Sequence, residues 1–330
     1  MLKFDRSYYE EEVRSDYTVK PMVKRNWAAL LEVLSEIDRV CKKYNITYFA
    51  DWGTLLGAIR HKSFVPWDDD MDLAMKREDY EKFQEILPIE FQNFEADIED
   101  QIDGKLYYYS PMKGEKNAAI QTIISNGNYI NFEDAFLKRY HGYPFVAAVD
   151  IFPLDYFPED TNETDLVYNV IKILEDITFA DVNWDENQKP SDEEVIDGIK
   201  RIEELIGFHF DYTGKLRKQC LVLMDSLSKM YSRDESKYLC SATWYSYHRE
   251  RDQRYQKEWY DEAVYVPFEN IEIPVPKEYD KVLTAMYKDY MTPRIYESHG
   301  DEQAKMLEEQ FDFKGQDPMT VVLNQIKDYE

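Results

Sequence analysis

The stretch PWDDDMDLAM, residues 66–75, places four aspartates within five positions, directly before an apolar run. A charge run is usually a solvated surface, but Leu73-Ala74-Met75 is typical of a buried strand. On a strand starting at Asp70, the side chains of Asp70 and Asp72 share one face, about 6.5 Å apart at a rise of ~3.3 Å per residue. Two bare carboxylates at that distance repel by about 2.5 kcal/mol at an effective dielectric of 20.

A divalent cation would turn this repulsion into binding, and carboxylate oxygens suit magnesium or manganese. We therefore predict a Mg²⁺ or Mn²⁺ site held by Asp70 and Asp72. A calcium loop is the rival, because Asp68, Asp70 and Asp72 have its alternating spacing, but Leu73 stands where such a loop needs glycine. Asp150, in the apolar run FVAAVDIF, is the candidate for a third carboxylate, with capping of a turn as its alternative role.

Upstream of the aspartates, Gly53-Thr54 stands where a predicted strand (46–52) passes into a short helix. Glycine permits close backbone approach, and free N–H groups at a helix start favour phosphate. Arg60 and His61 follow in a compact basic cluster. We expect Gly53, Thr54, Arg60 and His61 to bind a donor phosphate, although a surface ion pair for Arg60 and a structural role for His61 stay open.

The composition limits the classes of partner. The chain has 330 residues, 44% of them hydrophobic, and a formal net charge of -26. Such an acidic protein is repelled by nucleic acid and anionic lipid, so we expect no nucleic-acid partner and at most peripheral membrane contact. The charged amino terminus does not resemble a signal peptide, and no apolar run is long enough to span a membrane. With three widely spaced cysteines, the sequence predicts a cytoplasmic protein with reduced, buried thiols.

Hydrophobic periodicity predicts an α+β fold. A helix is expected over 22–44, ending at Asn45, and strands dominate 105–152, with Asn126-Gly127 as the turn of a hairpin. Helical patterns then cover 161–233. We predict a catalytic core with its N-terminal helix over 1–160, a helical insert over 161–233, and strands and helices over 234–330 that pack back on the core.

The stretch YFADWGTLLGAIRHKSFVPWDDDMDLAMKREDY, residues 48–80, resembles the signature of the LicD family, which is related to the fukutin-type transferases. The segment VDIFPLD and the stretch PVPKEYDKVLTAMYKDYMTP, followed by His299, are similar to the middle and closing motifs of that family. Lys288 departs from the pattern, because glycine is usual before Asp289.

The resemblance implies a nucleotidyltransferase-like mixed sheet flanked by helices. It also implies a metal-dependent phosphotransferase that moves a phosphorylated alcohol from a CDP-linked donor to a sugar hydroxyl of a cell-surface polysaccharide or glycolipid precursor, releasing CMP. Asp70, Asp72 and Asp150 would be the catalytic metal ligands, with Asp68, Asp69 and His299 as possible additional site residues. CDP-choline is the leading donor by family, and rings such as Tyr107 to Tyr109 are candidates to cage its trimethylammonium group.

Two other functions stay open from the sequence. One is a nucleotidyltransferase that moves a nucleoside monophosphate from a triphosphate to a small molecule, which would release pyrophosphate instead of CMP. The other is an inactive relative that binds glycan precursors.

Overall fold

The structure is a computed structural model, and it describes residues 1–94, 104–110, 120–159, 161–179, 192–241, 254–295, 315, 317–326 and 329. Its helices are η1 (Arg6–Tyr9), α1 (Pro21–Tyr44), α2 (Trp52–Arg60), α3 (Arg77–Glu90), α4 (Asp134–Arg139), α5 (Asn162–Phe179), α6 (Asp192–Ile206), α7 (Leu216–Ser228), η5 (Lys257–Tyr260), α9 (Tyr279–Tyr287) and α11 (Pro318–Ile326). Its strands are β1 (Glu12–Arg14), β2 (Tyr17–Val19), β3 (Phe49–Ala50), β4 (Asp72–Lys76), β5 (Gln92–Asn93), β6 (Tyr107–Tyr109), β7 (Thr122–Ser125), β8 (Ala148–Phe157), β9 (Tyr238–Ser241), β10 (Tyr255–Gln256), β11 (Ala263–Phe268) and β12 (Ile271–Pro276).

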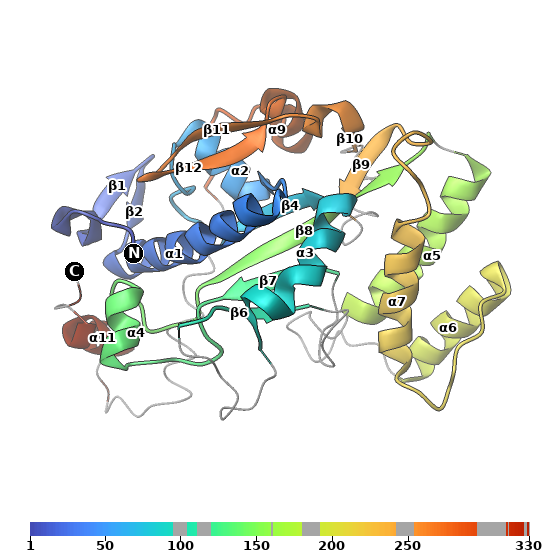
Figure 1. Cartoon of the computed structure of the whole chain (residues 1–330), viewed down its shortest axis with the longest axis horizontal. Coiled ribbons are helices and arrows are strands. Elements are labelled where there is room, and N and C mark those ends of the chain that lie inside the picture. Colours follow the sequence, from blue (N-terminus) through green and yellow to red (C-terminus); the bar gives the residue numbers. More distant parts are fainter. Residues whose placement is uncertain are drawn as a thin grey trace.

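A mixed sheet forms the centre of the fold (Figure 1). Within the described residues it has eight strands, in the order β10-β9-β8-β7-β6-β5, with β4 pairing with both β8 and β3. The β4–β8 and β5–β6 pairs are parallel and the others are antiparallel. The predicted α+β class, a mixed sheet flanked by helices, is confirmed.

The long strand β8 is the organising element of this sheet. It pairs with β7 at its start, with β4 in its middle and with β9 at its end. In the parallel β4–β8 ladder Asp72 is the register partner of Asp150. Two carboxylates that lie 78 positions apart in the sequence are therefore side by side on neighbouring strands.

Helix α1 supplies much of the core. It begins with Pro21 at its first turn and ends at Asn45, which has a φ of 53° in the left-handed region that stops a helix. Fourteen of its residues are buried, including Trp27 at 0% exposure, and it packs on β7 and β8. This agrees with the helix predicted from periodicity.

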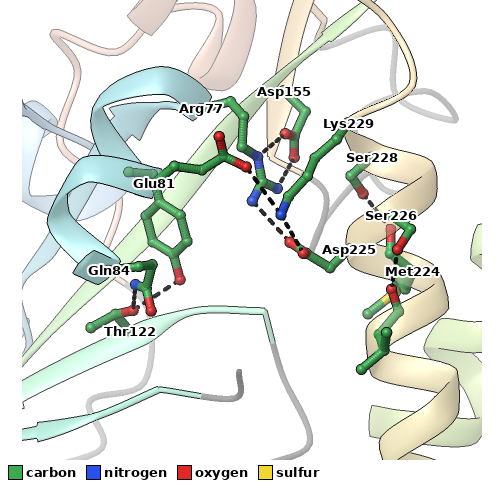
Figure 2. Close-up of polar contacts among 12 residues, drawn as sticks. Arg77, Glu81, Gln84, Thr122, Asp155, Met224, Asp225, Ser226, Ser228 and Lys229 are labelled. Atoms are coloured by element: carbon green, nitrogen blue, oxygen red, sulfur yellow. Dashed lines mark hydrogen bonds and ion pairs between the residues drawn. The ribbon is translucent and has the colours of Figure 1, made fainter. Parts of the chain in front are cut away.

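The helices α5, α6 and α7 lie together beyond the β9 end of the sheet (Figure 1). They share a hydrophobic cluster of their own, to which Phe157 of β8 and Cys240 of β9 also belong. A buried ionic network ties α7 to the sheet, with Arg77 bonded to both Asp155 and Asp225 (Figure 2). Within 161–233 the described residues form α5, α6 and α7, in agreement with the helical patterns, while the three-way division into domains stays a prediction.

Two local expectations were wrong. The strand with the aspartates begins at Asp72 and not at Asp70. No hairpin forms around Asn126-Gly127, because β7 pairs with β6 and β8 instead, and residues 128–133 lead without a strand into α4.

The three cysteines, Cys41, Cys220 and Cys240, are free and buried as predicted. Of the helices in the described ranges, none combines the length and apolarity needed to cross a membrane.

Candidate active site

A cleft of about 780 Å³ opens over the aspartate stretch. One wall comes from α2 and the loop that follows it, and the other comes from the end of α9 and the residues after it. The lining residues are Trp52, Gly53, Leu56, Arg60, Val65, Trp67, Asp68, Asp69, Asp70, Asp72, Met286, Tyr287, Lys288, Asp289, Tyr290, Thr292 and Arg294. A volume of this size is typical of a small-molecule site.

Gly53 lies in the first turn of α2, where a side chain would collide with an aspartate. A Cβ built there would come within 2.5 Å of Asp68 Oδ2. The residue before it, Trp52, has a φ of 45°, which is unusual for a residue with a side chain. The backbone bends sharply here, and glycine lets Asp68 lie against the start of the helix.

The position of Asp72 is fixed by this same turn. The Asp72 N–H donates to Thr54 Oγ1 at 2.9 Å, and the Asp51 N–H donates to the Asp72 carbonyl at 3.0 Å. Thr54 is 4% exposed and does not line the cleft. Within the Gly-Thr turn predicted to bind donor phosphate, Gly53 therefore lines the cleft, while Thr54 anchors the strand that carries Asp72.

Helix α1 holds the aspartate stretch by its main chain. Trp27 Nε1 donates to the Asp68 carbonyl at 2.9 Å, and Asn26 Nδ2 donates to the Asp69 carbonyl at 2.6 Å. Both side chains are buried. These two hydrogen bonds could not be predicted from the sequence. A main-chain carbonyl is the same in every residue, so the residue types at 68 and 69 do not reveal the side chains that bind there.

Burial and mutual repulsion raise the pKa values of the acidic side chains. Burial raises the pKa of Asp51 to about 7, and it does the same for Asp68 and for Asp150, with the Asp70 charge adding to both. The pKa of Asp72 rises well above its ordinary value, through burial and then the charges of Asp70 and Asp150. Asp51 Oδ1 is buried and has no hydrogen-bond partner. The Arg60 charge partly offsets the shift at Asp68.

The predicted metal ligands thus lie near one another, but they do not form a complete coordination site. Asp72 and Asp150 are register partners, Gln121 donates to Asp150 Oδ1 at 3.2 Å, and Asp70 is exposed at the cleft. In the described part of the chain, no three Asp, Glu, His or Cys side chains converge as metal ligands would. The donor set fits a hard divalent cation by its chemistry, since these are oxygen ligands and the Asp70 charge raises the pKa values of Asp72 and Asp150.

Arg60 presents a free donor at the cleft. Its Nη1 donates to the Tyr290 carbonyl at 2.9 Å, its guanidinium lies 5.8 Å from the centre of the Trp67 ring, and its buried Nη2 has no hydrogen-bond partner. A buried N–H without a partner is costly, and an anionic ligand oxygen would satisfy it.

His61 supports Arg60 and does not line the cleft. Its Nε2 accepts a hydrogen bond of 2.8 Å from Arg60 Nε. Burial and the charges of Arg60 and Arg14 lower the pKa of His61 to about 4. The imidazole is therefore neutral near pH 7, which favours a role in orienting Arg60 over direct binding of phosphate.

The C-terminal wall brings two further cations, Lys288 and Arg294, opposite the aspartates. Lys288 has a φ of 62°, a backbone conformation that favours glycine. The position thus has the conformation suited to the glycine that is usual there, although this sequence has lysine. Thr292 Oγ1 donates to Asp289 Oδ2 at 2.7 Å, which orders the segment after the helix. His299, the last predicted site residue, lies outside the described residues.

This arrangement defines a class of protein, since a Gly-Thr turn and acidic residues on neighbouring strands of a mixed sheet are the marks of a nucleotidyltransferase domain. Residues 45–163 match the family model described as LicD/FKTN/FKRP, nucleotidyltransferase domain. The LicD-type nucleotidyltransferase domain that the sequence motifs predicted is thus matched over this part of the chain.

Among curated relatives, the chain is 46% identical over 56 residues to the lipopolysaccharide cholinephosphotransferase LicD of Haemophilus influenzae, which is 17% of this chain and 21% of that protein. It is 42% identical over 60 residues to an uncharacterised protein of Rickettsia typhi, which is 18% of this chain and 19% of that protein. The match therefore spans about a fifth of the length of these relatives.

Proposed function

We propose that the protein is a metal-dependent phosphotransferase of the LicD type. It moves a phosphorylated alcohol from a CDP-linked donor to a sugar hydroxyl of a cell-surface glycan precursor and releases CMP. Phosphocholine is the leading alcohol phosphate, on the strength of the name of the Haemophilus relative. The observation that carries the proposal is one cleft that joins the aspartates and Arg60 on one wall to Lys288 and Arg294 on the other.

The charged groups of the cleft suit a reaction at the pyrophosphate of a CDP-linked donor. Arg60 Nη2 is available for a phosphate oxygen, and Lys288 and Arg294 add positive charge. Asp70, Asp72 and Asp150 would hold Mg²⁺ or Mn²⁺, which when bound would stabilise charge on the leaving phosphate oxygen. Gly53 lets the backbone of the turn come close to a donor phosphate.

The sugar hydroxyl must lose its proton as it attacks. Asp150 is suited to accept it, because burial and the Asp70 charge raise its pKa to about 7, close to the working pH of a general base. Gln121 orients the carboxylate through its bond to Oδ1. Attack in line with the leaving CMP oxygen then completes the transfer.

Two measurements test this function. The first is thermal stability with CDP-choline, CDP-ribitol, CDP-glycerol, CTP and ATP, each with and without Mg²⁺. A ligand at about 100 times its Kd stabilises by ~2.7 kcal/mol, so the true donor should give a visible Mg²⁺-dependent shift. A response to triphosphates alone would favour the nucleotidyltransferase, and no response would favour a binding module.

The second measurement is CMP release by Asp70→Asn and Asp72→Asn variants. We expect losses on the order of 10²-fold or more, because the charge stabilisation at the phosphate disappears. Asp197→Asn, at an exposed position on α6, is the matched control and should keep full activity. Unchanged CMP release from Asp72→Asn would contradict the proposal.

A further inference from the structure

A second cavity, of about 480 Å³, shares no lining residue with the aspartate cleft. It lies where β6 begins, β7 ends and α4 begins. The segment from Asn126 to Asn131, which was expected to form a hairpin, instead lines this cavity. The departure from regular structure therefore creates a concave surface at the sheet edge.

The lining combines aromatic rings with amide groups. Tyr107, Tyr129, Phe136 and Tyr140 contribute rings, and the Tyr129 ring is 53% exposed. Burial raises the pKa of the Tyr107 phenol, and the Tyr129 phenol adds to the shift.

Asn128 adds an acceptor whose partner is missing. Its Oδ1 is buried without a hydrogen bond. Asn126, by contrast, is used structurally, since its Oδ1 accepts from the Ala147 N–H at 2.8 Å. A ligand hydroxyl at Asn128 would satisfy the unpaired oxygen and so gain more than an exposed contact would.

The charged side chains here are already engaged by carbonyl groups. Lys105 Nζ donates to the Ile89 carbonyl and Arg139 Nη1 donates to the Gly104 carbonyl, while Glu133 adds a negative charge to the same lining. The cavity thus offers no concentrated positive charge for a pyrophosphate. Proteins bind sugars with aromatic rings, which stack on the C–H faces of the sugar, and with amides, which bind its hydroxyl groups. This cavity offers both.

The strand register places this cavity and the candidate catalytic carboxylates on one face of the sheet. Tyr107 pairs with Ser125, and Ser125 pairs with Ala148. Directly paired residues point to the same face, and so do residues two apart along a strand. Tyr107 and Asp150 therefore face the same side.

That face is the more open one. Along the start of β8, Ala148 and Asp150 are half-buried while Val149 and Ile151 are buried. Likewise Tyr107 and Tyr109 are half-buried on either side of the buried Tyr108. Two strand spacings separate β6 from β8, so Tyr107 lies on the order of 10 Å from Asp150.

We propose that this cavity and the open face of β6 and β7 bind the carbohydrate of the acceptor, with Tyr129 and Asn128 as its main contacts. The acceptor then runs along the face toward Asp150, where its terminal hydroxyl reacts. This inference rests on the proposed function and assigns the acceptor to a site separate from the donor cleft.

The test is retention of the full-length protein on an array of microbial polysaccharide fragments. We expect the wild type to bind at least one class of glycan, and Tyr129→Ala and Asn128→Ala to bind it at least tenfold more weakly. Tyr265→Ala, which removes a similarly exposed ring from β11, is the matched control and should bind normally. No retained glycan, or equal retention by Tyr129→Ala, would overturn the inference.

A transfer assay separates this inference from the proposed function. With a donor found in the thermal panel, Tyr129→Ala should raise the KM for the glycan and leave the KM for the donor unchanged. An unchanged glycan KM would refute the acceptor site while the function stands. Glycan binding that needs Tyr129, without transfer from any CDP-alcohol, would refute the function and support the carbohydrate site.

Discussion

Arg77 donates to both carboxylate oxygens of Asp155, from Nε at 2.5 Å and from Nη2 at 2.9 Å, and all of these groups are buried (Figure 2). The third nitrogen, Nη1, donates to Asp225 of α7 at 2.9 Å. Lys229 bonds to the same Asp225 at 2.7 Å and to Glu81 at 3.1 Å. One arginine thereby joins the start of α3, the strand β8 and the helices of the 161–233 region.

Replacing Arg77 with alanine should destabilise the protein by about 3–5 kcal/mol, because the buried Asp155 would lose its ion-pair partner and Asp225 would keep only Lys229. Urea denaturation measures the change. Arg39→Ala, which removes an exposed arginine bonded to Glu36 and Glu90, should cost under about 1 kcal/mol. Equal losses for the two variants would mean that the buried network adds nothing beyond a surface ion pair.

The two glycines of α2 should respond differently to alanine. At Gly57 a Cβ would meet the Ser63 carbonyl at 2.4 Å, and this backbone cannot easily move, so we expect a loss of stability of about 1–3 kcal/mol. At Gly53 it would meet only the Asp68 carboxylate, which can rotate away. Gly53→Ala should therefore keep its stability and lose donor affinity. Thermal melts with and without the CDP-alcohol separate the two effects.

Arg60→Gln should weaken donor binding by about tenfold or more, since a hydrogen bond between charged groups contributes roughly 1.5–3 kcal/mol. His61→Gln should have a smaller effect, because the glutamine carbonyl can still accept from Arg60 Nε. Calorimetry of the two variants with the donor measures the difference. A larger loss at His61 would show that the imidazole itself contacts the phosphate.

Without a divalent cation, stability should fall as the pH rises from 5 to 8. The folded-state pKa values of Asp51, Asp68 and Asp150 are about 7, well above the ordinary value of 3.8. The folded protein therefore holds protons that the unfolded chain has released, and this stabilisation is lost as the pH passes through 7.

Urea denaturation in chelator across this range is the measurement, and Asp150→Asn should flatten the trend. Asp134→Asn, at an exposed residue whose pKa is lowered, is the control and should leave the slope unchanged. If Mg²⁺ binds at this cluster, adding it should also reduce the slope. A slope in chelator that Asp150→Asn does not alter would exclude this carboxylate as its source.

Part of the local geometry could be predicted from the sequence, while the roles of the candidate residues stay predictions. Strand alternation and the apolar flank of Asp150 were sufficient to place Asp72 and Asp150 on neighbouring strands, and residue type alone located Gly53. The exact start of β4 was not predictable, because Asp70 and Asp72 have the same chemistry and only pairing with β8 selects Asp72.

Long-range support was harder to find. The hydrogen bonds from Asn26 and Trp27 to main-chain carbonyls depend on how α1 packs against the sheet. This packing cannot be deduced from the residue types alone. The wall formed by Lys288 and Arg294 was indicated only by the closing motif, and its position opposite the aspartates required the structure. The hairpin predicted at Asn126-Gly127 was wrong for the same reason, because β7 pairs with β6 and β8, which a local turn motif does not reveal.

The strand β8 carries Asp150 and Asp155, which are five residues apart and therefore point to opposite faces of the sheet. One carboxylate belongs to the candidate site and the other anchors the helices beyond the sheet. Deleting or inserting a single residue between them would place both on one face and disable both tasks at once. We therefore expect that related sequences can gain or lose residues in loops, but that the number of residues between Asp150 and Asp155 stays the same.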